Sequence, residues 1–320
     1  MIGVGVDFGT SNSAVAYFDG ESVELVQLEA DGPIMPTATY IDREFHTKTG
    51  NDAIRQYIGD NTGRTVELVP EVIGRASVLV SERSPGSRES AETLTQDIFS
   101  QSAFIDLGLK GRLFRGVKRL LGDKDMRRLM VFDHPYRLVA LITPVLLRMQ
   151  QTTAMGVGAH VAAANIGHPV NFEGKDPYRN KLALSRLGEA CRYAGFTDKT
   201  FYPEPVAATL SYLNDLATET EVAMTVDFGG GTLDLCVLRV HGTRYEVLAT
   251  HGVALGGDHI DQRMFRELLF PLLGKGEIWR RKGQYRMIET RFPFEDYEDL
   301  LLNWAMTYNL NQNRFRTPVM

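Results

Sequence analysis

The segment VDFGTSNS at Val6–Ser13 recurs, with changes, as VDFGGGTLD at Val226–Asp234. Each copy ends an apolar run in an aspartate and then turns through glycine. A glycine turn between two strands exposes successive backbone N–H groups and lets a phosphate approach without meeting a Cβ atom. The pair therefore predicts two phosphate-binding turns. The alternative is two ordinary hairpin turns whose aspartates bind local amides, and the repeated strand order around both turns disfavours it.

Apolar periodicity around the two turns predicts that one order of strands and helices begins twice along the chain. The first round has three antiparallel strands and then alternating helices and strands, at residues 2–8, 13–18, 22–28, 136–153, 160–167, 177–195, 199–203 and 204–216. The second round has three strands within residues 221–250 and a helix over 258–274. We expect Pro144 to kink the helix over 136–153 unless it lies in a first turn, and Gly195 to end the helix over 177–195.

The repeat divides the chain into a first lobe at residues 1–217 and the beginning of a second lobe at 218–320, which we expect to be incomplete. Residues 31–134 differ in character from the flanking sequence and are expected to form an inserted subdomain. Within this insertion, the polar segment 81–97 is typical of a loop or of a poorly packed insertion. Trp279 and the C-terminal tail are expected to form an amphipathic helix.

The composition favours a globular protein of the cytoplasm. With a formal net charge of −5, the chain lacks the basic field of a nucleic-acid-binding protein, so no nucleic-acid partner is expected. The longest apolar run, at residues 138–147, is too short to span a bilayer, and the N-terminus does not resemble a signal peptide. We therefore expect no membrane partner. Cys191 and Cys236 lie in apolar or helical segments without CxxC pairing, which is typical of core residues in a reducing compartment.

The aspartates beside the glycine turns indicate a metal ion. Thr10, Ser11 and Thr232 add hydroxyl donors to the turns, but Asp7 and Asp227 would repel a phosphate directly. They fit a hydrated Mg²⁺ ion that itself binds phosphate oxygens. Other glycine motifs are excluded, because no P-loop pattern is present and neither turn opens a helix. The sequence thus predicts a magnesium-bound polyphosphate held from both sides.

The two turns are similar to the first and second phosphate loops of the seventy-kilodalton heat-shock (DnaK-type) chaperones, a family of the actin-like ATPase superfamily. Four further segments resemble that family in the same order, namely GVKRLLG (116–122), IGHPVNF (166–172), YPEPVAATLSYL (202–213) and LATHGVALGGDHID (248–261). The resemblance spans roughly Met1–Asp261 and leans towards a YegD-like branch. It implies an α/β actin-like ATPase fold with duplicated, ribonuclease-H-like βββαβαβα lobes, the second of which is expected to be truncated.

The resemblance also implies roles for individual residues. Asp7 and Asp227 would orient the water molecules around Mg²⁺. Lys118 would neutralise charge on the transferred phosphoryl group, Glu204 would be the catalytic-site glutamate, and Pro169 would be a switch proline. The nucleotide would be bound by Gly9, Thr10, Ser11, Asn12, Gly229, Gly230, Gly231, Thr232, Asp234, Gly256 and Gly257.

Three of these assignments have alternatives. Lys118 lies in the basic run KGRLFRGVKR, and such runs are commonly solvated. Glu204 precedes Pro205 at a helix start, where a negative charge is favourable whatever its function. Asp234 fits either a water-positioning role or a solvent-facing place on a strand.

These features lead us to expect an ATP-binding, ATP-hydrolysing, chaperone-like protein with ATP or ADP and Mg²⁺ as ligands. Hydrolysis is expected where the complete second lobe is present. Possible partners are client proteins or co-chaperones, which the sequence does not identify. The alternatives are a small-molecule, sugar-type kinase of the same superfamily and a non-enzymatic, nucleotide-dependent scaffold or filament protein.

Overall fold

The computed structural model describes residues 3–64, 68–80, 92–106, 108–132, 134–172, 176–214, 220–241, 244–276, 278–282 and 287–291. The chain separates into two compact units. The first unit comprises Met1–Asp60 with Lys110–Leu273, and the second comprises Asn61–Leu109 with Gly274–Met320. Both predicted phosphate turns lie in the first unit. The lobe boundary near residue 217 stays a prediction.

A mixed sheet forms the centre of the first unit, with strand order β13-β12-β1-β2-β3. The antiparallel strands are β1 (Gly3–Phe8), β2 (Asn12–Phe18) and β3 (Val23–Leu25), and the parallel strands are β12 (Ala163–His168) and β13 (Asp198–Pro203). The short β4 (Met35–Pro36) also pairs with β2. Val4, Val6 and Phe8 alternate along β1 and are buried, because side chains two residues apart share one face of a strand.

Three helices follow the predicted order, α2 (Leu138–Val157), α3 (Arg179–Tyr193) and α4 (Glu204–Asn214). α2 buries an apolar face that includes Ile142, Val145 and Met149. Pro144 lies in the interior of α2 rather than in its first turn. Gly195, at φ 100°, follows the end of α3 in the left-handed conformation that glycine adopts easily.

A smaller sheet lies between the main strands in sequence, with order β6-β5-β9. Its strands are β5 (Ala38–Asp42), β6 (Thr47–Thr49) and β9 (Gly111–Arg115), and β10 (Arg128–Val131) and β11 (His134–Arg137) form a separate hairpin. Ala53 of α1 (Gly50–Asn61) packs on Ala38 and Tyr40 of the small sheet. A short 3₁₀ turn, η1 (Val117–Leu120), leads from β9 back towards the main sheet.

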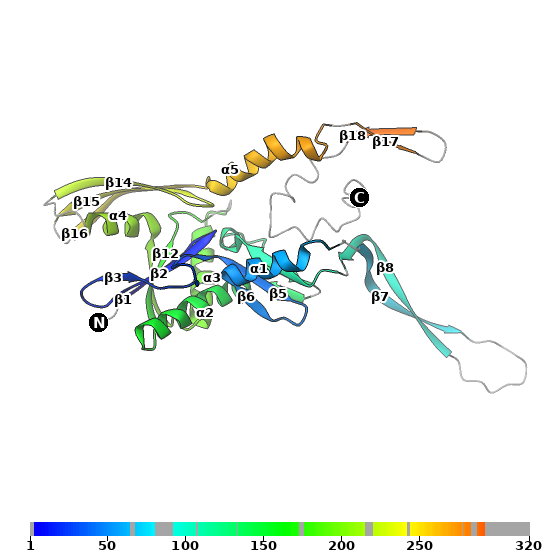
Figure 1. Cartoon of the computed structure of the whole chain (residues 1–320), viewed down its shortest axis with the longest axis horizontal. Coiled ribbons are helices and arrows are strands. Elements are labelled where there is room, and N and C mark those ends of the chain that lie inside the picture. The colour runs from blue at the N-terminus through cyan, green and yellow to red at the C-terminus, as the bar shows by residue number, and fades with distance from the viewer. Residues whose placement is uncertain are drawn as a thin grey trace, which may run out of the picture. The chain divides into compact units, whose positions relative to one another are not determined.

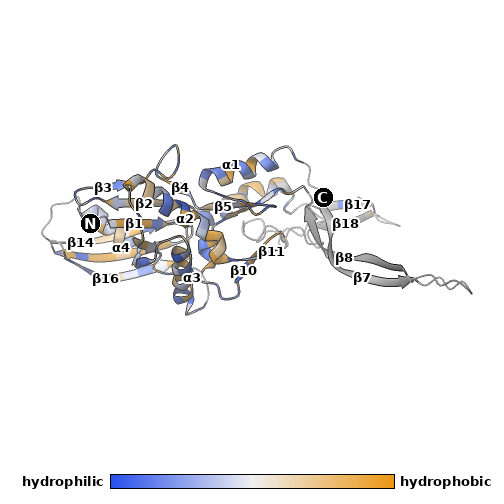
Figure 2. Cartoon of the chain, turned by 90° about the horizontal axis from the view of Figure 1, so that it is seen from below, coloured by the Kyte–Doolittle hydropathy of each residue, from blue (hydrophilic) through white to orange (hydrophobic). Residues whose placement is uncertain are grey.

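The second three-stranded sheet is antiparallel and contains β14 (Thr220–Phe228), β15 (Leu233–His241) and β16 (Arg244–Val253). It is followed by α5 (Gly257–Met264), a π turn (Phe265–Leu269) and a 3₁₀ turn (Pro271–Leu273). The strand order of the start of the chain is therefore repeated, as predicted. α4 packs against this sheet through Val206, Cys236 and Leu238 (Figure 1). Figure 2 shows hydrophobic residues along the strands of both sheets.

The second unit contains two hairpins among its described residues, β7 (Leu68–Val80) with β8 (Glu92–Asp106) and β17 (Ile278–Lys282) with β18 (Met287–Arg291). The prediction of a loop over 81–97 is wrong for Glu92–Asp97, which pair with Arg75–Val80 of β7 in an antiparallel hairpin. The rest of that loop lies outside the described residues. The helix predicted at Trp279 is also wrong, since Trp279 pairs with Thr290 in a strand, and the C-terminal tail lies outside the described residues.

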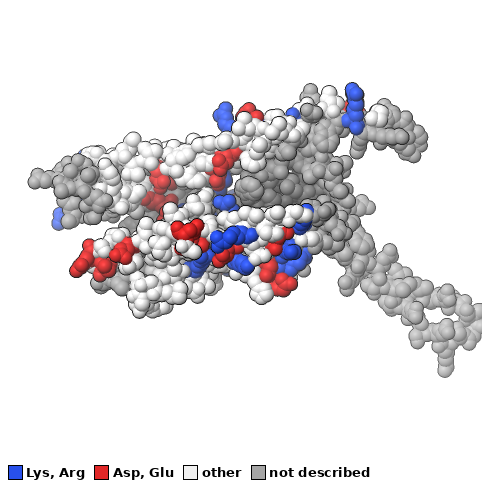
Figure 3. Space-filling view, viewed as in Figure 1, with Lys and Arg blue, Asp and Glu red and all other residues white. Residues whose placement is uncertain are grey.

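Charged side chains of both signs are interspersed on the face shown in Figure 3. Among the helices of the described part of the chain, none is both long and apolar enough to cross a membrane. Cys191 and Cys236 are buried and unpaired, as predicted, and burial raises the pKa of the Cys191 thiol to about 12.

Candidate functional site

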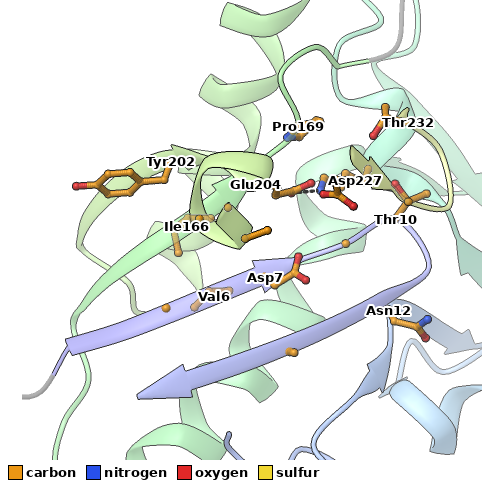
Figure 4. Close-up of a pocket in the computed structure, with 18 of the residues that line it drawn as sticks. Val6, Asp7, Thr10, Asn12, Ile166, Pro169, Tyr202, Glu204, Asp227 and Thr232 are labelled. Atoms are coloured by element: carbon orange, nitrogen blue, oxygen red, sulfur yellow. Dashed lines mark hydrogen bonds and ion pairs between the residues drawn. The ribbon is translucent and has the colours of Figure 1, made fainter. Parts of the chain in front are cut away.

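A pocket of about 860 Å³ opens in the first unit between the two glycine turns. It is bounded by the ends of β1 and β12, the start of α4, and η1. Of the predicted site residues, its lining contains Asp7, Gly9, Thr10, Ser11, Asn12, Lys118, Pro169, Glu204, Asp227, Gly229, Gly230, Gly231 and Thr232. The side chains of Asp7, Glu204 and Asp227 point towards one another, and Thr10 lies next to Asp227 (Figure 4).

The first turn is folded so tightly that its leading residue must be glycine. A Cβ atom on Gly9 would lie 2.2 Å from the carbonyl oxygen of Asn12. The turn is also tied to the following segment, because Thr37 N–H donates to the carbonyl oxygen of Ser11 at 2.9 Å. This anchoring holds Thr10 and Ser11 at the pocket.

The second turn lies directly against the first. Gly229 N–H donates to the carbonyl oxygen of Thr232 at 2.9 Å and closes the turn. A Cβ atom on Gly230 would lie 2.5 Å from the hydroxyl oxygen of Ser11. Two turns separated by more than two hundred residues of sequence therefore contact each other. The repeated motif predicts this contact, and the structure shows it.

Gly256 and Gly257 support the second turn and do not line the pocket. Gly257 N–H donates to the carbonyl oxygen of Gly229 at 2.9 Å. A Cβ atom on Gly256 would lie 2.4 Å from the carbonyl oxygen of Gly230. The Gly-Gly pair thus allows α5 to start in contact with the backbone of the turn.

Lys118 is buried, with 4% of its surface exposed, so the alternative of a solvated basic run is wrong for this residue. Its ammonium group lies 2.7 Å from a carboxylate oxygen of Glu204. η1 places the lysine there, since Gly116 before it adopts φ 66° and lets the chain turn inwards. Glu204 is the first residue of α4, and its carboxylate binds Lys118 in addition to lying at the positive helix end.

Three carboxylates crowd the centre of the pocket. Loss of solvent raises the pKa of Asp7 to about 6, and repulsion from Glu204 is the next cause, partly offset by Lys118. The pKa of Asp227 is also raised, first by desolvation and then by Glu204. Asp7 keeps contact with solvent through the pocket, although protein atoms remove much of its hydration. Lys118 alone does not balance these charges, so the donor set fits a divalent cation.

Asp234 is buried, with 1% of its surface exposed, so a solvent-facing place on the strand is wrong. It shares one face of β15 with Cys236 and Leu238. Its carboxylate accepts the Val170 N–H at 3.2 Å and the Thr232 hydroxyl at 3.0 Å. Asp234 therefore connects the segment after Pro169 to the second turn from outside the pocket lining.

Two arginines near the site were not singled out from the sequence. Arg119 lines the pocket, and its position next to Lys118 in the sequence could have identified it as a site residue. Arg186 of α3 directs one nitrogen, Nη1, at the carbonyl oxygens of Leu121 and Asp123, at 2.9 and 2.8 Å, just after η1. No sequence pattern identifies this contact, because it joins residues more than sixty positions apart.

Comparison with known proteins decides the family. A family described as "Hsp70 protein" matches residues 119–284, which is more than half of the chain. This chain belongs to the Hsp70 family. The predicted relationship to the seventy-kilodalton heat-shock chaperones and the actin-like ATPase fold it implies are therefore confirmed, and the family supports a nucleotide-binding role.

The chain is also similar to a curated relative, the Chaperone protein HscA homolog of Polynucleobacter asymbioticus. The two are 27% identical over 265 residues, which cover 82% of this chain and 36% of that protein. The match thus covers little more than a third of the length of this Hsp70 relative.

Proposed function

We propose that this Hsp70-family chain binds Mg²⁺-ATP or Mg²⁺-ADP with the phosphates between its two glycine turns, and that it hydrolyses ATP as part of a chaperone. The observation that carries the proposal is convergence on one pocket. Gly9–Asn12, Gly229–Thr232, the carboxylates and Lys118 come from distant parts of the sequence and line the same cavity. Exposed backbone N–H groups and hydroxyls from both sides suit a polyphosphate.

A magnesium ion would be held through water molecules by Asp7 and Asp227. The fit rests on the closeness of Asp7, Asp227 and Glu204 in the pocket lining, where desolvation first and then repulsion from Glu204 raise the pKa values of both aspartates. When bound, Mg²⁺ would neutralise phosphate charge and draw electrons from the bond that breaks. Asp7 and Asp227 come from equivalent places in the two rounds of the repeat, so each half of the unit would supply one carboxylate.

Lys118 is suited to stabilise negative charge that develops during transfer. It is buried, and it is held by a single carboxylate of Glu204 at 2.7 Å. A fixed charge in a site with little water acts strongly on a developing charge and needs no reorganisation during the reaction. Glu204 orients the ammonium group and, through its remaining oxygen, can accept a hydrogen bond from an attacking water molecule.

Calorimetry with Asp227→Ala tests the proposal. Removing this carboxylate should weaken binding of Mg²⁺-ADP by at least about tenfold, while binding of ADP without Mg²⁺ should change little. Asp261→Ala, on the exposed surface of α5, is the matched control and should bind as the wild type does. Equal losses with and without Mg²⁺ would contradict the metal role, and absence of nucleotide binding by the wild type would refute the function.

A further inference from the structure

An ion pair beside the pocket joins two parts of the first unit, which we call its halves. One half carries η1, and the other carries the second sheet and α5. Arg119, which follows Lys118 in η1, places its Nη1 atom 3.3 Å from Oδ2 of Asp258. Asp258 is the second residue of α5 and follows the second sheet, whereas η1 lies between β9 and β10, before α2. The pair thus spans 139 positions of sequence. Neither residue has a role in the proposal above.

Asp258 binds both η1 and the second turn. Its backbone N–H donates to the carbonyl oxygen of Gly230 at 2.8 Å, while its side chain binds Arg119. The next residue back, Gly257, binds Gly229 in the same way. The start of α5 is therefore fixed to the second turn through its backbone, and to the element that carries Lys118 through one carboxylate.

We propose that Arg119 and Asp258 are positioning residues, which set the distance between Lys118 and the second turn when the nucleotide is bound. The inference rests on the proposed function, because both Lys118 and Gly229–Thr232 would have to reach the same phosphate. These two groups are carried by different halves of the unit, and the Arg119–Asp258 pair joins the halves at the pocket. Neither residue donates or accepts a proton in the reaction.

The partial exposure of the pair limits its strength. The Arg119 side chain is 23% exposed and that of Asp258 is 32% exposed, so water and salt reach both. A pair of this kind contributes modestly, so it restricts the arrangement of the elements that it joins by a small factor. Because alignment affects the transition state more than ground-state binding, its loss should lower the hydrolysis rate more than nucleotide affinity.

The kinetic test is a double-mutant cycle with Arg119→Gln, Asp258→Asn and the double variant. Asp258→Asn keeps the backbone bond to Gly230 and so preserves the second turn. Each single variant should lower the single-turnover rate of Mg²⁺-ATP hydrolysis about three- to fivefold and change Mg²⁺-ADP affinity less than about twofold. The double variant should lose no more than either single variant, because the pair acts as one unit.

Matched controls are Arg128→Gln on β10 and Asp261→Asn on α5, both at exposed positions outside the pocket lining. They should keep wild-type rates. Unchanged rates in the single variants, or losses that add in the double variant, would overturn the inference while leaving nucleotide binding intact. A wild type that binds no Mg²⁺-ADP would instead refute the proposed function, and this inference with it.

A nucleotide-free measurement gives independent evidence. Spin labels at Asp125→Cys and Arg263→Cys would report the separation of the two halves, and labelling is selective because Cys191 and Cys236 are buried. The wild type should give a narrower distribution of distances than Arg119→Gln does. Identical distributions would show that the pair does not hold the halves together and would overturn the inference.

Discussion

At the scale of single residues, the site depends on charges that the fold forces together. Asp7 and Asp227 are crowded by Glu204, and Lys118 has lost nearly all contact with solvent. A buried ammonium group is tolerated only with a close partner, which Glu204 provides. This crowding is unfavourable in the free protein, and under the proposed function a bound cation would relieve it.

The raised pKa of Asp7 predicts a pH dependence of stability. Between the ordinary value of 3.8 and the folded value of about 6, the native state holds a proton that the unfolded state has lost. This group's contribution to the free energy of unfolding therefore falls as pH rises through that window. Asp7→Asn cannot ionise, so its stability relative to the wild type should increase from about pH 4 to about pH 7 in denaturant titrations. A constant difference would contradict the shift.

Lys118 is predicted to affect chemistry more than binding. Under the proposed function, Lys118→Ala should lower the single-turnover rate of ATP hydrolysis by at least about a hundredfold, since it would remove a charge that acts mainly on the transition state. Nucleotide affinity, measured by calorimetry, should stay within about threefold of the wild type. Lys124→Ala, at an exposed position of the same region, is the control. An unchanged rate would remove Lys118 from the site.

At the scale of elements, η1 is short and depends on its surroundings for its position. A turn of four residues has few internal hydrogen bonds, and its C-terminal carbonyl groups need donors from elsewhere. Arg186 supplies them from α3, with Nη1 shared among the carbonyl oxygens of Leu120, Leu121 and Asp123. The geometry of Lys118 is therefore set partly by a helix that does not contact the pocket.

Removal of this donor should destabilise the fold locally. Arg186→Met keeps most of the aliphatic chain but leaves the carbonyl groups after η1 without the arginine donor. The substitution should therefore lower the free energy of unfolding, measured by denaturant titration, by about 1–3 kcal/mol. The control Arg192→Met changes an exposed arginine of the same helix and should cost less than about 0.5 kcal/mol. Equal effects of the two substitutions would show that Arg186 does not hold η1.

At the scale of the whole molecule, the second sheet has two unlike faces. One face carries Cys236 and Leu238 and is covered by α4. The other face exposes alternate apolar side chains of β14, with Val222 at 60%, Met224 at 67%, Val226 at 55% and Phe228 at 48% exposure. Contiguous apolar surface of this kind favours association.

The chain of 320 residues is therefore predicted to self-associate as its concentration rises. Met224→Gln combined with Val226→Thr should shift sedimentation velocity profiles towards the monomer, because it lowers the apolar surface while threonine keeps strand propensity. Met155→Gln is the matched control, since Met155 is 77% exposed at the end of α2. Association that is insensitive to the double substitution would place the interface elsewhere.

The sequence by itself determined the two glycine turns, the order of strands and helices in the two rounds of the repeat, and the family. These properties are local or periodic, so they can be predicted without contacts: Asp7–Gly9 and Asp227–Gly229 end alternating apolar runs, and Gly195 follows a helical pattern. The strand at Glu92–Asp97 was missed because its polar composition suggests a loop, and pairing with β7 overrides it.

The tertiary structure alone decided how the site is assembled. The burial of Lys118 against Glu204, the place of Asp234 beside Val170, and the supports from Arg186 and Asp258 all join residues far apart in sequence. Such contacts follow from packing of the whole unit and leave no local pattern. The basic run around Lys118 has the composition of a solvated surface. Lys118 is buried because the chain turns at Gly116 and because Glu204 on α4 pairs with its ammonium group.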